Sequence, residues 1–143
     1  MESLRDSLVK IALEWEEKFT VMPQITSAIS EYDAAYLIGC NDQIYTNIMK
    51  GQTAVTKGYD FEYSGQKYQI KANRPSGKKG SFVTLVGKAR NYEWDFLIWI
   101  LYDKEFNIQE AWQFDVEKYK KLFDQKNRLC PDDMRKGKCL IKK

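Results

Sequence analysis

The first forty residues of the chain repeat apolar and charged positions with the period of an α-helix. Residues 3–20 follow this period and predict an amphipathic helix, which Pro23 ends or follows. A second helix is expected to begin at Thr26 or Ser27, whose hydroxyl groups suit a helix cap, and to stop at Gly39. One face of this second helix is predicted to carry Ala28, Tyr32, Ala35 and Tyr36.

After a short third helix expected over residues 42–50, the pattern changes to one typical of strands. Residues 53–63 are rich in β-branched and aromatic side chains, and residues 66–72 alternate between apolar and polar. The Ser-Gly pair at 64–65 separates the two stretches and predicts a hairpin turn. Residues 74–81 combine glycine, proline and lysine and predict a flexible basic loop.

A nearly continuous apolar run, Phe96–Tyr102, predicts a central strand that is covered on both faces of a sheet. Residues 106–114 predict a further strand, and Asp115 is expected to cap a helix that runs to about Phe123. Residues 124–143 are expected to form a basic tail. The order of elements predicts an α/β fold with a central mixed β-sheet flanked by helices, in a single domain over residues 1–143.

Composition narrows the class of protein. The 143 residues are 43% hydrophobic, which is enough for a packed core, and the net charge of +3 permits a nucleic-acid partner without demanding one. The longest apolar run is too short to span a bilayer, and the first residues lack the pattern of a signal peptide, so no membrane association and a cytoplasmic location are expected. Three widely spaced cysteines indicate neither a disulfide framework nor a zinc motif.

The chain contains no histidine. This excludes hydrolases that use a serine or cysteine nucleophile with histidine, and metal sites built on imidazole. Any catalysis must therefore use carboxylate, amide, lysine, tyrosine or cysteine side chains, and no organic cofactor is expected.

Asp60, Gln69 and Lys71 are predicted to converge at the hairpin. Gln69 and Lys71 are two residues apart on one strand and therefore project to the same face, and the turn folds Asp60 back towards them. Asp60, the Gln69 side-chain oxygen and the Ile70 backbone carbonyl would supply oxygen ligands for Mg²⁺, for which Mn²⁺ would substitute. Lys71 would lie beside a metal-bound water or a scissile phosphate.

The motif of Asp60, eight intervening residues and Gln69-Ile70-Lys71 resembles the active site of the PD-(D/E)xK nuclease superfamily, which has the restriction-endonuclease-like fold. The resemblance extends over roughly residues 26–123, with the buried strand following the motif, and it implies metal-dependent DNA hydrolysis. The family also uses a glutamate on a preceding helix as a metal ligand, which implies this role for Glu31. The acids Glu14, Glu16 and Glu17 compete for that role, and Glu62 remains an alternative ligand because Gln69 replaces the usual acid.

Basic residues that follow the motif are candidates for contacts with a phosphate backbone. They are Lys67, Arg74, Lys78, Lys79, Lys88 and Arg90, for which a solvated loop is the alternative interpretation. The tryptophans Trp94, Trp99 and Trp112 are expected in the core rather than as platforms for stacked bases.

The sequence therefore predicts a Mg²⁺-dependent endonuclease that hydrolyses phosphodiester bonds in DNA. Two alternatives remain open. The first is a catalytically weak or inactive module of the same fold that binds nucleic acid or a protein, and the second is a subunit that needs a partner for target recognition. An enzyme that cuts both strands of a duplex would be expected to act as a homodimer, because the duplex is itself nearly symmetric.

Overall fold

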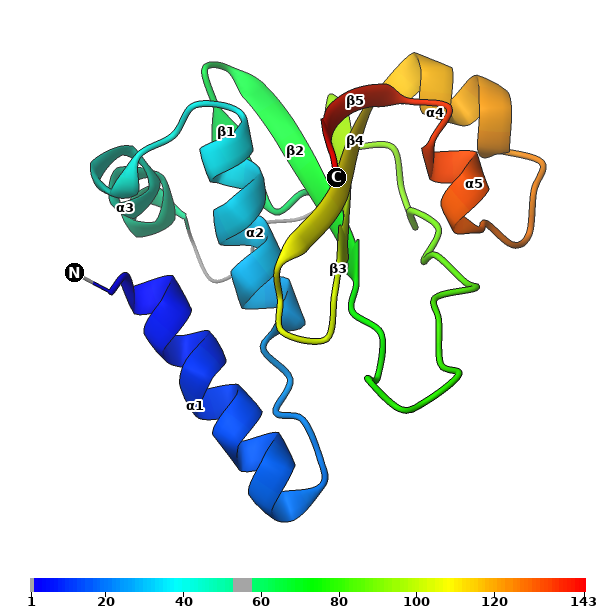
Figure 1. Cartoon of the computed structure of the whole chain (residues 1–143). Coiled ribbons are helices and arrows are strands. Elements are labelled where there is room, and N and C mark those ends of the chain that lie inside the picture. The colour runs from blue at the N-terminus through cyan, green and yellow to red at the C-terminus, as the bar shows by residue number, and fades with distance from the viewer. Residues whose placement is uncertain (1, 53–57) are drawn as a thin grey trace.

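The protein, described here by a computed structural model over residues 2–52 and 58–143, is an α/β structure with helices on both faces of a mixed sheet (Figure 1). The chain runs from the helices into the sheet and returns to helices near its C-terminal end. Its elements in order are α1 (Leu4–Phe19), α2 (Thr26–Leu37), α3 (Asp42–Gly51), β1 (Phe61–Tyr63), β2 (Gln66–Asn73), β3 (Phe96–Tyr102), β4 (Ile108–Asp115), α4 (Val116–Phe123), α5 (Pro131–Met134) and β5 (Lys138–Lys142).

The strands of the described residues form one five-stranded sheet in the order β1-β2-β3-β4-β5. β2 and β3 are parallel, and each of the other neighbouring pairs is antiparallel. β1 has three residues and pairs with β2 only from Gln66 to Tyr68, whereas β2 continues to Asn73. Beyond Tyr68, β2 therefore pairs with β3 on one side and leaves its other side to the bend that precedes β1.

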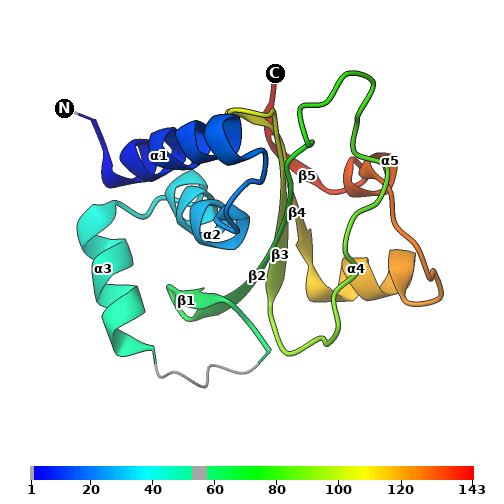
Figure 2. The ribbon, with the colours of Figure 1, turned by 90° about the horizontal axis from the view of Figure 1, so that it is seen from below.

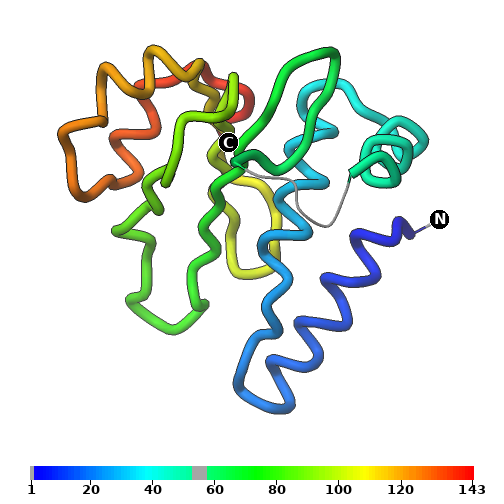
Figure 3. The backbone as a smooth tube through the Cα atoms, turned by 180° about the vertical axis from the view of Figure 1, so that it is seen from behind, coloured from blue at the N-terminus to red at the C-terminus, as the bar shows by residue number. Residues whose placement is uncertain are grey.

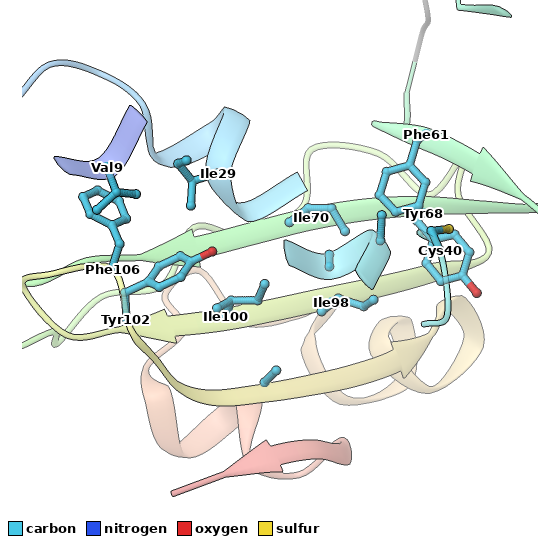
Figure 4. Close-up of a cluster of buried hydrophobic side chains, with 13 residues drawn as sticks. Val9, Ile29, Cys40, Phe61, Tyr68, Ile70, Ile98, Ile100, Tyr102 and Phe106 are labelled. Carbon is cyan, nitrogen blue, oxygen red and sulfur yellow. The ribbon is translucent and has the colours of Figure 1, made fainter. Parts of the chain in front are cut away.

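Helices α1, α2 and α3 lie on one face of the sheet, and α4, α5 and the segment that links β2 to β3 lie on the other (Figures 2 and 3). The first face packs on a cluster that includes Ile70, Ile98 and Ile100 (Figure 4), and the second packs on a cluster that includes Trp99 and Trp112. Side chains of β3 are buried on both faces of the sheet, which confirms the prediction of a central strand covered on two faces.

A buried ion pair fixes α1 against α2. The guanidinium of Arg5 donates to both carboxylate oxygens of Asp33 at 3.0 and 2.9 Å, and it also donates to the backbone oxygen of Phe106. Tyr102 donates to Asp33 at 2.6 Å. The charged groups of Arg5 and Asp33 and the hydroxyl of Tyr102 all have hydrogen-bond partners, so no unpaired charge is buried here. These contacts give α1 one defined orientation.

Several sequence predictions need correction. Helix α2 begins where expected, but its N-cap is Ile25 and no side chain caps it. Its buried positions are Ile29, Ser30, Asp33, Ala34 and Ala35, whereas Ala28 and Tyr36 are exposed. The buried face of α2 thus includes two polar side chains, because Arg5 and Tyr102 partner Asp33, and the Ser27 backbone oxygen partners Ser30, inside the protein.

The predicted strand over residues 53–63 and the predicted tail also differ from the structure. Residues 53–57 lie outside the described residues, and of residues 58–63 only Phe61–Tyr63 is strand, since residues 58–60 form a bend. The segment 124–143 is not a tail, since it contains α5 and the edge strand β5, which pairs with β4. The predicted cap of α4 is confirmed, because Asp115 accepts a hydrogen bond from the Lys118 amide. The three tryptophans expected in the core, Trp94, Trp99 and Trp112, are buried.

Within residues 2–52 and 58–143, no helix has both the length and the apolar character that a membrane crossing requires.

Candidate active site

A polar pocket of about 280 Å³ lies at the edge of β2 that β1 leaves uncovered. The first two turns of α2 form one wall, the bend before β1 forms a second, and β2 forms the floor. Its lining residues are Thr26, Ser27, Ser30, Glu31, Asp60, Gln69, Ile70, Lys71 and Ala72. Every residue that the sequence predicts as catalytic or metal-binding is among them.

Asp60 bonds to the edge of β2 at the point where pairing with β1 ends. Its backbone amide donates to the Tyr68 oxygen at 2.8 Å, which continues the β1–β2 ladder by one residue. Its side chain then accepts from the Ile70 amide at 2.7 Å, the next group along the edge of β2. Gln52 donates to the Asp60 backbone oxygen at 2.7 Å and fixes the bend from the other side. These contacts orient Asp60 towards the pocket before any ligand binds.

The Ile70 amide also defines the direction of the Ile70 carbonyl. In an extended strand, the N–H and C=O of one residue project towards the same neighbour. Because the Ile70 amide points to Asp60, the Ile70 carbonyl faces the same uncovered edge. The Ile70 side chain is buried in the first core cluster, as the alternation predicts (Figure 4).

The side-chain amide of Gln69 contacts Asp60 directly. Its Nε2 donates to Asp60 Oδ2 at 3.2 Å, so Oε1 is the amide atom that remains for a cation. The same carboxylate oxygen thus accepts two hydrogen bonds, from Gln69 and Ile70.

Glu31 brings a second carboxylate to the pocket from α2. Burial raises its pKa, and the negative charge of Asp60 raises it further, to about 7. An acid whose charged form is disfavoured by burial and by a neighbouring carboxylate is costly to keep in a fold, and such groups concentrate at functional sites. The alternatives considered from sequence, Glu14, Glu16, Glu17 and Glu62, do not line this pocket.

Lys71 lies close enough to Asp60 and Arg90 to feel the charge of both. Burial lowers the pKa of its ammonium group, the charge of Asp60 opposes this shift, and the charge of Arg90 adds to it. The pocket therefore combines two carboxylates, a side-chain amide, the backbone carbonyl of Ile70 and a lysine.

Arg90 is the residue near the pocket whose position the sequence did not indicate. It lies in the segment 86–95, which contacts α4 and the second core cluster. The Ala89 amide donates to the Tyr119 hydroxyl at 3.0 Å, and the Tyr92 hydroxyl donates to Asp124 at 2.6 Å. The flanking residues thus anchor Arg90 beside Lys71, although the two are nineteen positions apart in the sequence.

Two of the six predicted DNA-contacting residues instead serve the fold. Lys88 donates to the backbone oxygens of Asp124 and Lys126 at 2.9 and 2.7 Å, at the C-terminal end of α4. Arg74 is the second and is 7% exposed at its side chain. Of the others, Lys67 lies over the Tyr59 ring, and Lys78, Lys79 and Arg90 are exposed.

Arg74 joins α1 to the loop after β3. Its guanidinium donates to both Glu16 carboxylate oxygens at 2.9 Å and to the Lys104 backbone oxygen, and it lies over the Phe106 ring. The donors of Arg74 are thus already engaged within the protein, and a contact between Arg74 and DNA stays a prediction.

Arg74→Ala is accordingly expected to lower the free energy of unfolding by about 2 kcal/mol, since it leaves Glu16 unpaired and removes stacking on Phe106. Urea denaturation would measure the change. Lys79→Ala, at an exposed loop position, is the matched control and should leave unfolding unchanged. A stable Arg74→Ala protein with weakened DNA binding would restore the original assignment.

No protein-family model matches the chain, and a search of the curated proteins finds no match. Inferences about function therefore depend on the pocket itself. Within the described part of the chain, no group of three or more His, Cys, Asp or Glu side chains is placed to hold a metal ion. The pocket offers two carboxylates together with neutral oxygen donors.

Proposed function

We propose that this protein is a metal-dependent phosphodiesterase that acts on DNA and has a restriction-endonuclease-like fold. The observation that supports this most directly is the convergence of Glu31, Asp60, Gln69, Ile70 and Lys71 on one pocket. These residues come from a helix, a bend and a strand, which is the arrangement that the resemblance to PD-(D/E)xK nucleases implies.

The donor set fits a hard divalent cation. Mg²⁺ in proteins typically takes one or two carboxylates and keeps several waters or substrate phosphate oxygens. Asp60 and Glu31 would hold the ion, together with the Ile70 carbonyl and Gln69 Oε1. A cation would also relieve the repulsion that raises the pKa of Glu31. When bound, Mg²⁺ or Mn²⁺ would stabilise charge on a phosphoryl oxygen and lower the pKa of a coordinated water.

Lys71 acts at the reacting phosphate. Its Nζ carries a positive charge close to where negative charge develops on the phosphoryl oxygens during hydrolysis. Because burial lowers its pKa, this ammonium also exchanges a proton more readily near neutral pH than an exposed lysine does. Lys71 is therefore positioned both to neutralise charge on the phosphate and to exchange a proton with the attacking water.

Arg90 supplies a second cation next to Lys71. A guanidinium binds two phosphate oxygens at once, which positions a DNA backbone as well as neutralising it. The exposed Lys78 and Lys79 extend the positive surface along the loop after β2. This set of residues supports nucleic acid as the ligand, with affinity that falls as salt rises.

One observation favours a second candidate, a DNA-binding module of the same fold without turnover. Gln69 is neutral and donates its Nε2 to Asp60, so it occupies a carboxylate oxygen that an acid at this position would leave to the metal. A weakened metal site would preserve the binding surface and lose the chemistry.

Supercoiled plasmid and a linear duplex, incubated with the protein in Mg²⁺ or Mn²⁺, separate the two candidates. The proposed enzyme should nick or cut the DNA, chelation should stop it, and Asp60→Asn should reduce the rate by about 100-fold. Salt-sensitive DNA binding without cleavage in either metal would support the binding module. Absence of both cleavage and binding would contradict both candidates.

A further inference from the structure

A stripe of large apolar side chains on α1 faces away from the protein. Its members follow one another at intervals of three or four residues, so they share one side of the helix. Their exposed fractions are 88% for Leu4, 39% for Leu8, 62% for Ile11, 51% for Trp15 and 51% for Phe19. The buried side of the same helix carries the smaller residues Val9 and Ala12.

The fold itself fixes this orientation. Near its N-terminal end α1 is tied to α2 by the Arg5–Asp33 ion pair, and near its C-terminal end it is tied to the rest of the protein by Glu16 and Arg74. Two buried or half-buried ion pairs at opposite ends prevent the helix from rolling its apolar stripe inward. The stripe therefore stays on the exposed side of α1. Figures 1 and 2 show that α1 itself lies at the outside of the helical layer.

The apolar surface continues beside the stripe. A groove of about 290 Å³ runs between α1, α2 and α3, and Leu4 and Leu8 line it together with Tyr32, Tyr45 and Met49. Contiguous apolar surface of this kind on a protein is typical of an interface. The exposed stripe and the groove together form one surface, which we call the α1 face.

We propose that the α1 face binds the α1 face of a second copy of this chain, with the two α1 helices antiparallel. The charges beside the stripe favour this occupant. Lys10 and Glu14 are both exposed and lie one turn apart on the same flank of the stripe. An antiparallel pair centred near Ile11 brings the same flank of both helices together, so that Lys10 of each copy lies near Glu14 of the other. A parallel pair places this flank on opposite sides of the contact and forms no such pairs of opposite charge.

The sizes of the side chains also favour an antiparallel pair. In this register Leu8 lies opposite Trp15 of the second copy, and Leu4 lies opposite Phe19, so each aromatic ring meets a leucine. A parallel pair would place each aromatic ring against its own copy. The contact is isologous, as in most homodimers, and α1 is about 24 Å long, so the contact can extend along the whole stripe.

Sedimentation velocity from about 1 to about 100 µM tests the inference. The wild-type protein should shift from monomer to dimer, and Ile11→Asp should remain monomeric, because each dimer would then bury two facing carboxylates. Phe82→Asp is the matched control, since Phe82 is 75% exposed on the opposite side of the sheet and should not alter association. A wild-type monomer throughout, or equal effects of both substitutions, would overturn the proposal.

Exchange of charges tests the orientation. Lys10→Glu and Glu14→Lys should each weaken the dimer by about ten-fold at low salt, and the double variant should regain wild-type association. Failure of the double variant to recover would exclude the antiparallel register. The proposal does not depend on the proposed function, because Lys71→Ala should dimerise like the wild type whether or not the protein cleaves DNA.

Discussion

Replacement of Lys71 by alanine should reduce the rate of DNA cleavage by about 100- to 1,000-fold and leave the fold intact. Lys71 places a positive charge in the pocket beside Asp60. Among residues 2–52 and 58–143, the ion pairs that hold the fold together do not include Lys71. Its removal takes away transition-state stabilisation without opening a cavity among packed side chains. Single-turnover cleavage of a labelled duplex would measure the rate.

Lys71→Arg separates the two roles of the ammonium group. Arginine keeps the positive charge but remains protonated at any working pH, so it cannot exchange a proton with the attacking water. Partial activity in Lys71→Arg would show that charge dominates, and activity as low as that of Lys71→Ala would show that proton transfer or shape dominates.

Lys118→Ala is the matched control for Lys71→Ala, because Lys118 is an exposed lysine on α4. It should cleave at the wild-type rate. DNA affinity should be measured in parallel by fluorescence anisotropy, so that lost binding is not mistaken for lost chemistry. Wild-type cleavage by a folded Lys71→Ala protein would contradict the proposed function.

The predictions that held depend on local patterns. β3 is apolar at every position, and a run of this kind fits only a strand that is covered on two faces. The Asp115 cap follows from the hydrogen-bonding geometry of a helix start, which three or four residues determine. The convergence of Asp60 with Gln69 needs only the hairpin turn, so it too was accessible from the sequence.

Contacts between residues that are distant in the sequence could not be predicted from local patterns. Arg74 is an ordinary basic loop residue in the sequence, and its partner Glu16 is 58 positions away. Ser30 and Asp33 are polar residues that are buried in α2, and the partners that satisfy them are visible only in the structure. Local patterns do not encode these pairings.

The missed strand β5 illustrates a different limit. Its five residues Lys138–Lys142 lie at the sheet edge, and only Leu140 and Ile141 are partly buried apolar residues. Edge strands commonly carry lysines, which obscure the apolar alternation of a strand. Arg90 was missed as a neighbour of Lys71 because no turn or repeat relates the two positions.

Glu31→Gln should make the protein more stable and less active at the same time. The pKa of Glu31 is raised from 4.5 to about 7, so the folded protein binds this proton more tightly than the unfolded chain does. Its contribution to stability is therefore present below about pH 4.5 and is lost as pH rises through about 7. Glutamine does not titrate, so the Glu31→Gln protein does not lose stability in this way as pH rises.

In chelator at about pH 8, Glu31→Gln should raise the free energy of unfolding by about 1 kcal/mol, a value reduced for the partial exposure of the side chain. At about pH 4.5 the variant and the wild type should unfold alike. Thermal melts across this range would measure the difference. Cleavage at neutral pH should fall by about 100-fold, because one of the two carboxylates proposed to hold the cation is gone.

The effect of metal on thermal stability tests whether Glu31 is a metal ligand. Mg²⁺ or Mn²⁺ should raise the melting temperature of the wild type at about pH 8, since a ligand that binds only the folded state stabilises it. The same ions should have little effect on Glu31→Gln. Glu62→Gln is the matched control, because Glu62 is exposed on β1 outside the pocket, and it should respond to metal as the wild type does. If the metal stabilises Glu31→Gln fully, Glu31 is not a ligand, and its raised pKa reflects burial beside Asp60 alone.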